Sequence, residues 1–220
     1  AQEVTQDTMK QLDISTWNRK HQFEFYNTFA DPYFGVTVKM DVTQAYRFAK
    51  ENQLSFFAVY LHDCLKAVNA VEPFRYRIVE ENQVVIHDVI HASATMLRPD
   101  NTFGFSFIDY DPDLAVFHER LQAEKARVMK STELFPPKNT EDCIYCSALP
   151  WLDFTGHKEA VSGWKESVPK FAFGKMVEEG EKRTMSFAIS VSHALMDGYH
   201  LSLFTEQLQA NLLAHPVAAL

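Results

Sequence analysis

The 220-residue sequence predicts an α/β protein, a mixed sheet covered by helices. Segments with strand-type alternation and segments with helix-type periodicity follow one another along the whole chain. Hydrophobic residues make up 46% of the chain and include 18 phenylalanines, which is ample apolar material for a core. No linker interrupts this pattern, so we expect a single domain over residues 1–220, with a frayed segment at 1–8.

The first third of the chain predicts short strands joined to helices. Apolar and polar residues alternate over 34–42, as in a strand with two different faces. The segment 55–71 is apolar almost all round, which is typical of a helix buried on most sides. In order, the expected elements are a strand at 9–14, a helical segment at 17–26 capped by Ser15 or Thr16, the strand at 34–42, a helix at 43–52 capped by Thr43, and the helix at 55–71.

The middle of the chain predicts a hairpin, a pair of strands and a long helix. Two short apolar runs flank residues 80–83, whose composition suits a hairpin turn. Asp111 and Pro112 suit the N-cap and the first turn of a helix. The expected elements are strands at 75–79, 84–87, 91–96 and 102–108, a helix over about 111–128, and a strand at 143–149.

The last third predicts two strands and a C-terminal helix. The strands cover 171–177 and 183–191 and flank a charged turn at 178–182. After Gly198, leucines and one phenylalanine recur at helical spacing. The resulting order of strands and helices supports the α/β class.

Residues 183–193 place a histidine at the end of an apolar strand. Successive side chains of a strand face opposite ways, and His193 has the same parity as Ile189 and Val191. It therefore follows the apolar face, where burial favours a neutral imidazole. A general base requires that neutral form. The alternative from spacing alone is a histidine packed at a sheet edge before a turn at Asp197.

Charge and cysteine content exclude several classes of protein. The net charge of −8 disfavours nucleic acid as a partner, because phosphates require a basic face. No apolar run approaches the roughly 20 residues of a membrane helix, and no signal peptide is apparent at the N-terminus. The three cysteines, Cys64, Cys143 and Cys146, are few and odd in number, so we expect a reduced, cytoplasmic protein.

Two clusters of possible metal ligands favour structural roles. Cys143 and Cys146 lie three apart in an expected strand and so face opposite sides, and no second cysteine pair exists. His87, Asp88 and His91 are expected at the surface. We therefore predict no metal site. The chain also lacks the glycine-rich fingerprints of nucleotide-binding loops.

Four segments resemble the chloramphenicol acetyltransferase family. Residues 193–198, H-A-L-M-D-G, match the family's H-x-x-x-D-G motif, of which dihydrolipoyl acyltransferase and condensation domains carry variants. Residues 17–26 are similar to its W-x-R-(R/K)-x-x-F-E-F-Y segment. Leu-Phe-Pro at 134–136 and Ser-Ala-Leu-Pro-Trp at 147–151 also fit, in the family's order. The resemblance runs from about residue 9 to residue 213.

The resemblance implies acetyl transfer from acetyl-coenzyme A, a co-substrate, to a hydroxyl of chloramphenicol or a similar small acceptor. His193 would take the proton of that hydroxyl, and the oxygen would attack the thioester directly, without an acyl-enzyme. Ser147 would donate to the oxyanion. Asp197 would pair with Arg19 and support the histidine loop, and it would not belong to a proton relay. This arrangement differs from the serine protease triad, in which the aspartate hydrogen-bonds the imidazole.

The resemblance also implies a homotrimer with each active site between two subunits. The histidine would come from one subunit and most of the acceptor pocket from its neighbour. By position, the acceptor pocket would be lined by Tyr26, Phe34, Phe103, Phe105, Phe135, His157 and Val161. Trp151 and Lys175 would lie along the coenzyme A tunnel. From the residues alone, each of these side chains is equally compatible with core or surface.

The sequence departs from the family pattern at several expected site positions. These are Ser192 in place of the first of two histidines, Phe105 in place of a small residue, His157 and Glu159 in a stretch that is usually apolar, Ser55 in place of a lysine near the coenzyme A phosphate, and Ala172 in place of a threonine. The alternatives are a same-fold acyltransferase with a different acceptor, such as a dihydrolipoyl group, and an inactive trimeric scaffold.

Overall fold

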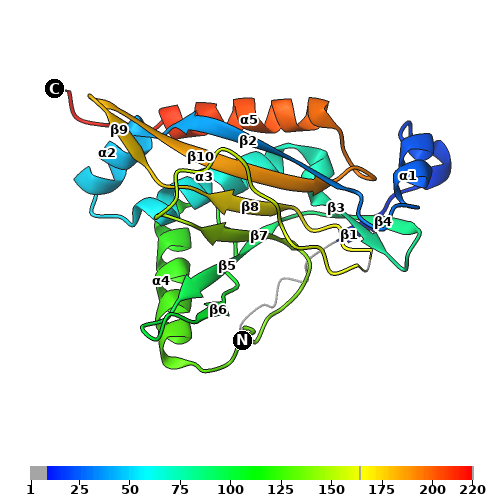
Figure 1. Ribbon diagram of the computed structural model, residues 1–220, viewed down its shortest axis with the longest axis horizontal. Helices are drawn as coiled ribbons and strands as arrows, with labels where there is room; N and C mark the ends of the chain where they lie inside the picture. Colours follow the sequence, from blue (N-terminus) through cyan, green and yellow to red (C-terminus); the bar gives the residue numbers. More distant parts are fainter. Residues whose placement is uncertain (1–8, 164, 220) are drawn as a thin grey trace.

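A mixed sheet with helices on one face forms the body of the computed structural model, which describes residues 9–163 and 165–219 (Figure 1). Within these residues the sheet runs β2-β10-β8-β7-β5-β6, and β9 pairs with β10. Strand β7 is parallel to β5 and β8, and the other pairs are antiparallel. The strands are β2 (Tyr33–Asp41), β5 (His91–Leu97), β6 (Phe103–Phe105), β7 (Cys143–Ala148), β8 (Lys170–Phe173), β9 (Val177–Glu179) and β10 (Lys182–Ser192).

Four α-helices pack against one face of this sheet. Helix α3 lies at the centre and contacts the other three. Its apolar circumference predicted burial, and ten of its fifteen residues are buried, as expected for a helix enclosed on most sides. The helices are α2 (Thr43–Glu51), α3 (Phe56–Ala70), α4 (Leu114–Lys130) and α5 (Gly198–Leu213). No helix in the described ranges has the length and apolarity to cross a membrane.

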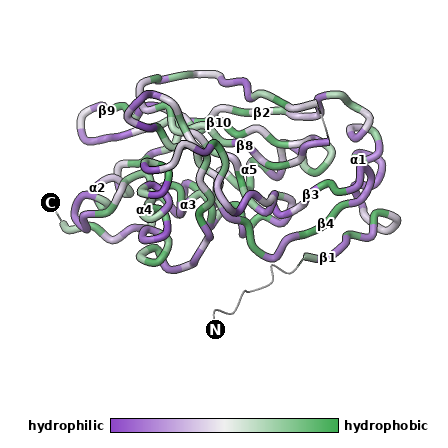
Figure 2. The backbone as a smooth tube through the Cα atoms, turned by 90° about the horizontal axis from the view of Figure 1, so that it is seen from below, coloured by the Kyte–Doolittle hydropathy of each residue, from purple (hydrophilic) through white to green (hydrophobic). Residues whose placement is uncertain are grey.

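A second, smaller sheet lies at the end of the molecule that carries α1 (Lys20–Tyr26) (Figure 1). Its strands β1 (Met9–Gln11), β4 (Gln83–His87) and β3 (Tyr76–Val79) are antiparallel in that order. Strands β3 and β4 are largely hydrophobic (Figure 2). The fully buried Arg77 joins the two sheets, because its guanidinium donates to the carbonyls of Glu141 and Cys143 before and in β7.

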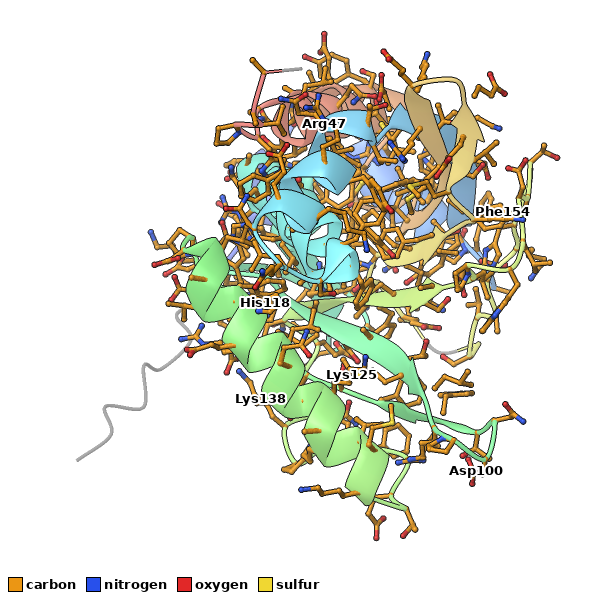
Figure 3. All side chains as sticks on the ribbon, turned by 90° about the vertical axis from the view of Figure 1, so that its left-hand side faces the viewer. Arg47, Asp100, His118, Lys125, Lys138 and Phe154 are labelled. Atoms are coloured by element: carbon orange, nitrogen blue, oxygen red, sulfur yellow. The ribbon has the colours of Figure 1, made fainter. Side chains whose placement is uncertain are left out.

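The other face of the main sheet is crossed by the loop between β7 and β8. Phe154 on this loop and helix α4 lie on opposite sides of the strands (Figure 3). Hydrogen bonds hold the loop down: Lys175 N donates to Leu152 O at 2.8 Å, and Tyr33 Oη donates to Val168 O at 2.7 Å. The loop therefore covers part of the face that the helices leave open.

Helix starts differ from the sequence-based expectations. Asp13, not Ser15 or Thr16, is the cap, and it caps a short 3-10 helix (Ile14–Thr16) that precedes α1. Thr43 is the first residue of α2, after an N-cap at Val42. The remaining difference concerns α4: Asp113 caps it, and Asp111 instead accepts from Asp113 N at 2.8 Å. Pro112 thus lies before the helix. Aspartates cap the 3-10 helix and α4, whereas Val42 gives α2 no side-chain cap and Asp41 Oδ1 accepts from Thr43 N at 3.0 Å.

Strand ends also differ. Strand β1 stops at Gln11. Strand β8 stops at Phe173: Gly174 N still donates to Ser186 O in register, but Lys175 N donates to Leu152 O of the loop, and pairing with β10 resumes only at β9. The expected strand at 102–108 is shorter, β6 (Phe103–Phe105), followed by an isolated bridge between Ala92 and Ile108. Residues 1–8, expected to fray, lie outside the described residues.

The structure confirms the expectation for the cysteine pair but not the expectation for His91. Cys143 and Cys146 face opposite sides of β7 as predicted, since they belong to different hydrophobic clusters. The surface expectation for His91 is wrong: only 11% of its side chain is exposed, and its ring lies between Asp109 and Asp142. Loop segments fold over the start of β5 and cover this histidine, which strand alternation alone does not reveal.

Candidate active site

The His193 ring lies between two aromatic rings just past the end of β10. Tyr26 from α1 stacks on it at 4.1 Å between centroids and 2° between planes. Phe34 from β2 lies at 4.2 Å, tilted by 31°. His193 N continues the pairing with the β2 side by donating to Pro32 O at 2.9 Å. The imidazole is thus held by both main chain and ring contacts, with 27% of its side chain exposed.

Arg19 and Asp197 support the histidine from behind. One guanidinium nitrogen of Arg19 forms an ion pair with Asp197 Oδ2, and the other donates to the His193 carbonyl at 2.6 Å. The Arg19–Asp197 pairing suggested by the family resemblance is therefore present. Asp197 Oδ1 also lies 3.2 Å from the buried Nδ1 of His193, but this contact does not have the geometry of a hydrogen bond. The carboxylate contacts both the arginine and the imidazole.

His200 fixes the start of α5 behind this group. Its Nδ1 accepts a hydrogen bond from Asp197 N at 3.0 Å. Burial lowers the pKa of His200, which favours the neutral ring that this acceptor role requires. The expectation that His200 is packed rather than catalytic agrees with this position.

Ser147 lies in a cavity of about 490 Å³ on the sheet face away from the helices. The cavity is lined by aromatic, hydroxyl and charged side chains, among them Phe105, Phe135, Tyr145, Glu159, Glu166 and Lys170. Phe105 stacks on Phe135 at 5.5 Å. Two of the expected acceptor-binding phenylalanines therefore do share a cavity with the expected oxyanion donor.

Within one chain, Ser147 and His193 are far apart. Ser147 pairs with Ala172 of β8, and Ala172 pairs with Ala188 of β10, so Ser147 is level with Ala188. His193 lies five residues farther along β10, which is about 17 Å along the strand and two strand spacings, or about 10 Å, to the side. One chain cannot place both groups on one reacting carbonyl.

The expected acceptor residues accordingly form two separate groups. Tyr26 and Phe34 contact His193, whereas Phe105 and Phe135 line the cavity of Ser147. Phe103 is 46% exposed and packs against Phe105 at 5.4 Å. The two remaining residues lie on the loop: His157 packs near Phe154 and 3.5 Å from Glu159, and Val161 is half-buried.

A separate groove of about 340 Å³ contains one of the two expected coenzyme A residues. Trp151, 64% exposed, lines it together with Ser55 and Lys125. Ser55 caps α3 by accepting from Ala58 N at 3.2 Å. Lys175 is exposed and is not part of this groove in the described structure.

Sequence reasoning missed several polar residues of the Ser147 cavity, among them Tyr145, Glu166 and Lys170. Tyr145 was detectable, because it shares the strand parity of Ser147. Glu166 and Lys170 had no local signal. Lys170 Nζ lies 2.6 Å from Glu166 Oε1. Burial alone raises the pKa of Glu166, but hydrogen bonds from Lys170 and Ser162 outweigh it, and the pKa is lowered.

Comparisons with known proteins agree with this architecture. The family profile "Chloramphenicol acetyltransferase" matches residues 8–209. The chloramphenicol acetyltransferase of Streptomyces acrimycini is 28% identical over 93% of this chain and 94% of its own, and that of a Klebsiella species is 30% identical over 90% and 91%. A solved chloramphenicol acetyltransferase superposes with a TM-score of 0.80 at 26% identity, over 93% of this chain and 100% of the other.

More distant structures share the fold only. The dihydrolipoamide acetyltransferase of Azotobacter vinelandii has a TM-score of 0.65 at 15% identity, over 88% of this chain and 86% of the other. The fold is therefore that of coenzyme A-dependent acyltransferases. Because the family profile spans most of the sequence, the chain belongs to the chloramphenicol acetyltransferase family and is an acyltransferase enzyme.

Proposed function

We propose that this protein moves an acetyl group from acetyl-coenzyme A to a hydroxyl of chloramphenicol or a similar small acceptor. The observation that carries the proposal is the clamped His193, with Asp197 against its buried Nδ1. The carboxylate 3.2 Å from Nδ1 favours a proton on that nitrogen, and we infer that Nε2 is the basic nitrogen that meets the acceptor. The names and profile of the relatives support the acceptor class.

In the proposed reaction, the acetyl group passes directly from the thioester to the acceptor, and His193 carries the proton. His193 Nε2 accepts the hydroxyl proton while the acceptor oxygen bonds to the thioester carbonyl carbon. The carbon–sulfur bond then breaks, and the imidazolium returns the proton to the leaving thiolate. The products are the acetyl ester and free coenzyme A. Asp197 and Tyr26 keep the ring oriented through both proton transfers.

Ser147 stabilises the oxyanion of this reaction, and it does so from a second copy of the chain. The support is the separation of Ser147 from His193 along the sheet, which leaves neither end complete. A hydroxyl donor acts only within hydrogen-bond distance of the oxyanion. We therefore propose the homotrimer with shared sites. Exposed apolar side chains beside the histidine end, Phe25 at 59% and Phe29 at 43%, suit such an interface.

Coenzyme A occupies the groove of Trp151 in this proposal. The indole offers a face for a purine ring, and the Lys125 ammonium offers a charge for a phosphate. Lys125 lines the same groove as Ser55, so it supplies a cation where the family's usual lysine is missing. His118, which accepts from Ser55 N at 3.1 Å, fixes the adjoining turn.

The direct test is thiol release from acetyl-coenzyme A with and without chloramphenicol, followed with a thiol reagent. Release that depends on chloramphenicol supports the proposed acceptor. Release only with other alcohols supports the same chemistry with a different acceptor. Absence of release with every acceptor overturns the proposal in favour of an inactive scaffold.

A further inference from the structure

The cavity around Ser147 carries one negative charge that no cation balances in the described chain. Its charged lining residues are Glu159, Glu166 and Lys170. Lys170 is only 6% exposed, and its Nζ forms an ion pair with Glu166 Oε1 at 2.6 Å. Its ammonium also donates to the Ala160 carbonyl. With histidines counted as neutral, Glu159 leaves the cavity with a formal charge of −1.

Glu159 has no lysine or arginine partner among the described residues. His157 Nδ1 lies 3.5 Å from its Oε1. The neighbouring Lys158 donates to the Glu159 backbone carbonyl and not to the carboxylate. Only 24% of the Glu159 side chain is exposed, so water screens this charge less than it screens a surface glutamate. A carboxylate in this setting favours a cationic ligand.

The other walls of the cavity also suit a cation. Phe105 and Phe135 stack at 5.5 Å, and Tyr145 belongs to the same lining. Aromatic faces attract an ammonium group through their negative electrostatic potential, and more strongly when the group is desolvated. A carboxylate and aromatic rings around one cavity of about 490 Å³ are a recognition pattern for an organic ammonium.

We propose that the acceptor of this enzyme is an amino alcohol whose ammonium group binds beside Glu159, while its hydroxyl receives the acetyl group. The inference rests on the proposed function and specifies its substrate class. Glu159 is a specificity-determining residue, and Ser147 in the same cavity marks where the reacting carbon lies. A neutral amide analogue lacks the charge and binds less tightly.

The experiment compares two acceptors that differ at one nitrogen, which is a charged ammonium in the first and a larger, neutral amide in the second. One is the free amine of chloramphenicol, 2-amino-1-(4-nitrophenyl)propane-1,3-diol, and the other is its N-acetyl derivative, which is neutral. Binding to the full-length assembly is measured by calorimetry at pH 7, and acetyl transfer by thiol release. Glu159→Gln removes the charge at nearly constant shape. Glu181→Gln, in the exposed turn before β10, is the matched control.

In the unchanged protein and in Glu181→Gln, the amine is expected to bind at least about tenfold more tightly than the amide, as is typical of a charged hydrogen bond. Glu159→Gln should erase this preference and leave amide binding within about twofold. Equal binding of the two acceptors by the unchanged protein, or a preference that survives in Glu159→Gln, overturns the inference. Calorimetry decides whether the ammonium group binds beside Glu159 even if no transfer occurs. Absent transfer with every acceptor overturns the proposed function, and with it the acetylation of the bound hydroxyl, but not the binding.

Discussion

Two regions of the main sheet, which we call the His193 end and the Ser147 end, differ in how they hold their polar groups. At the His193 end, Tyr26, Phe34 and Asp197 surround the imidazole, and Arg19 completes the cluster. At the Ser147 end, side chains line an open cavity. The first end orients one reactive group and the second leaves space for a ligand. Under the proposed function, the reaction uses both ends, and two copies of the chain bring them together.

Removing the base should have the largest effect. His193→Ala is expected to lower kcat by up to about 10⁴-fold, because no neighbouring group can replace its basic nitrogen. Thiol release measures the loss, and size-exclusion chromatography checks that the assembly persists. Near-normal turnover would exclude His193 as the base.

Removing the oxyanion donor should have a smaller effect. Ser147→Ala is expected to lower kcat by about 10²–10³-fold, the usual effect of losing one such donor. Steady-state kinetics with saturating acceptor separates this loss from weaker binding. If kcat does not change, Ser147 is not at the oxyanion.

Mixing the two inactive variants tests whether the ends meet between copies. His193→Ala retains Ser147, and Ser147→Ala retains His193. Co-refolded at equal amounts, they should regain activity at roughly one interface in four if subunits mix randomly. Each variant refolded alone is the control. A mixture no more active than its components would contradict the shared site.

Breaking the support of the histidine should reduce stability moderately. Arg19→Ala leaves Asp197 without its cation, but Asp197 is 40% exposed, so water reduces the penalty of a fully buried pair. We expect the free energy of unfolding to fall by about 1–2 kcal/mol. Urea denaturation measures this. Arg19→Lys should recover only part of the loss, since one ammonium cannot pair with Asp197 and reach the His193 carbonyl as the guanidinium does.

The smallest expected effect is on the pH dependence of stability. Burial lowers the pKa of His200 below its unfolded value of about 6.5. The neutral ring therefore stabilises the fold fully above about pH 6.5, and this contribution is lost as the pH falls through the folded pKa. His200→Asn should flatten the acid decrease in Tm, while the exposed His21→Asn should not. Parallel curves for all three proteins would contradict this role.

Local patterns in the sequence predicted most elements of the fold. The apolar circumference of 55–71 predicted a buried helix, and the parity of residues 183–193 predicted the apolar face of β10. Caps were predicted less well, as at Asp113, because several polar side chains near a helix start satisfy the same sequence rule. The end of β8 was predicted wrongly, because Lys175 N bonds to Leu152 O of the β7–β8 loop, a contact between segments distant in the chain.

The sequence by itself determined the faces of strands and helices and the family motif around His193, because both depend on residues close together in the chain. Only the tertiary structure decided that Ser147 and His193 lie two strands and about five residues apart on the sheet, since strand order and direction depend on contacts between distant segments. The same holds for the cavity charge. The charge of Glu159 is unpaired because the Lys170 ammonium contacts Glu166 instead. Only the folded chain sets the distance between these side chains.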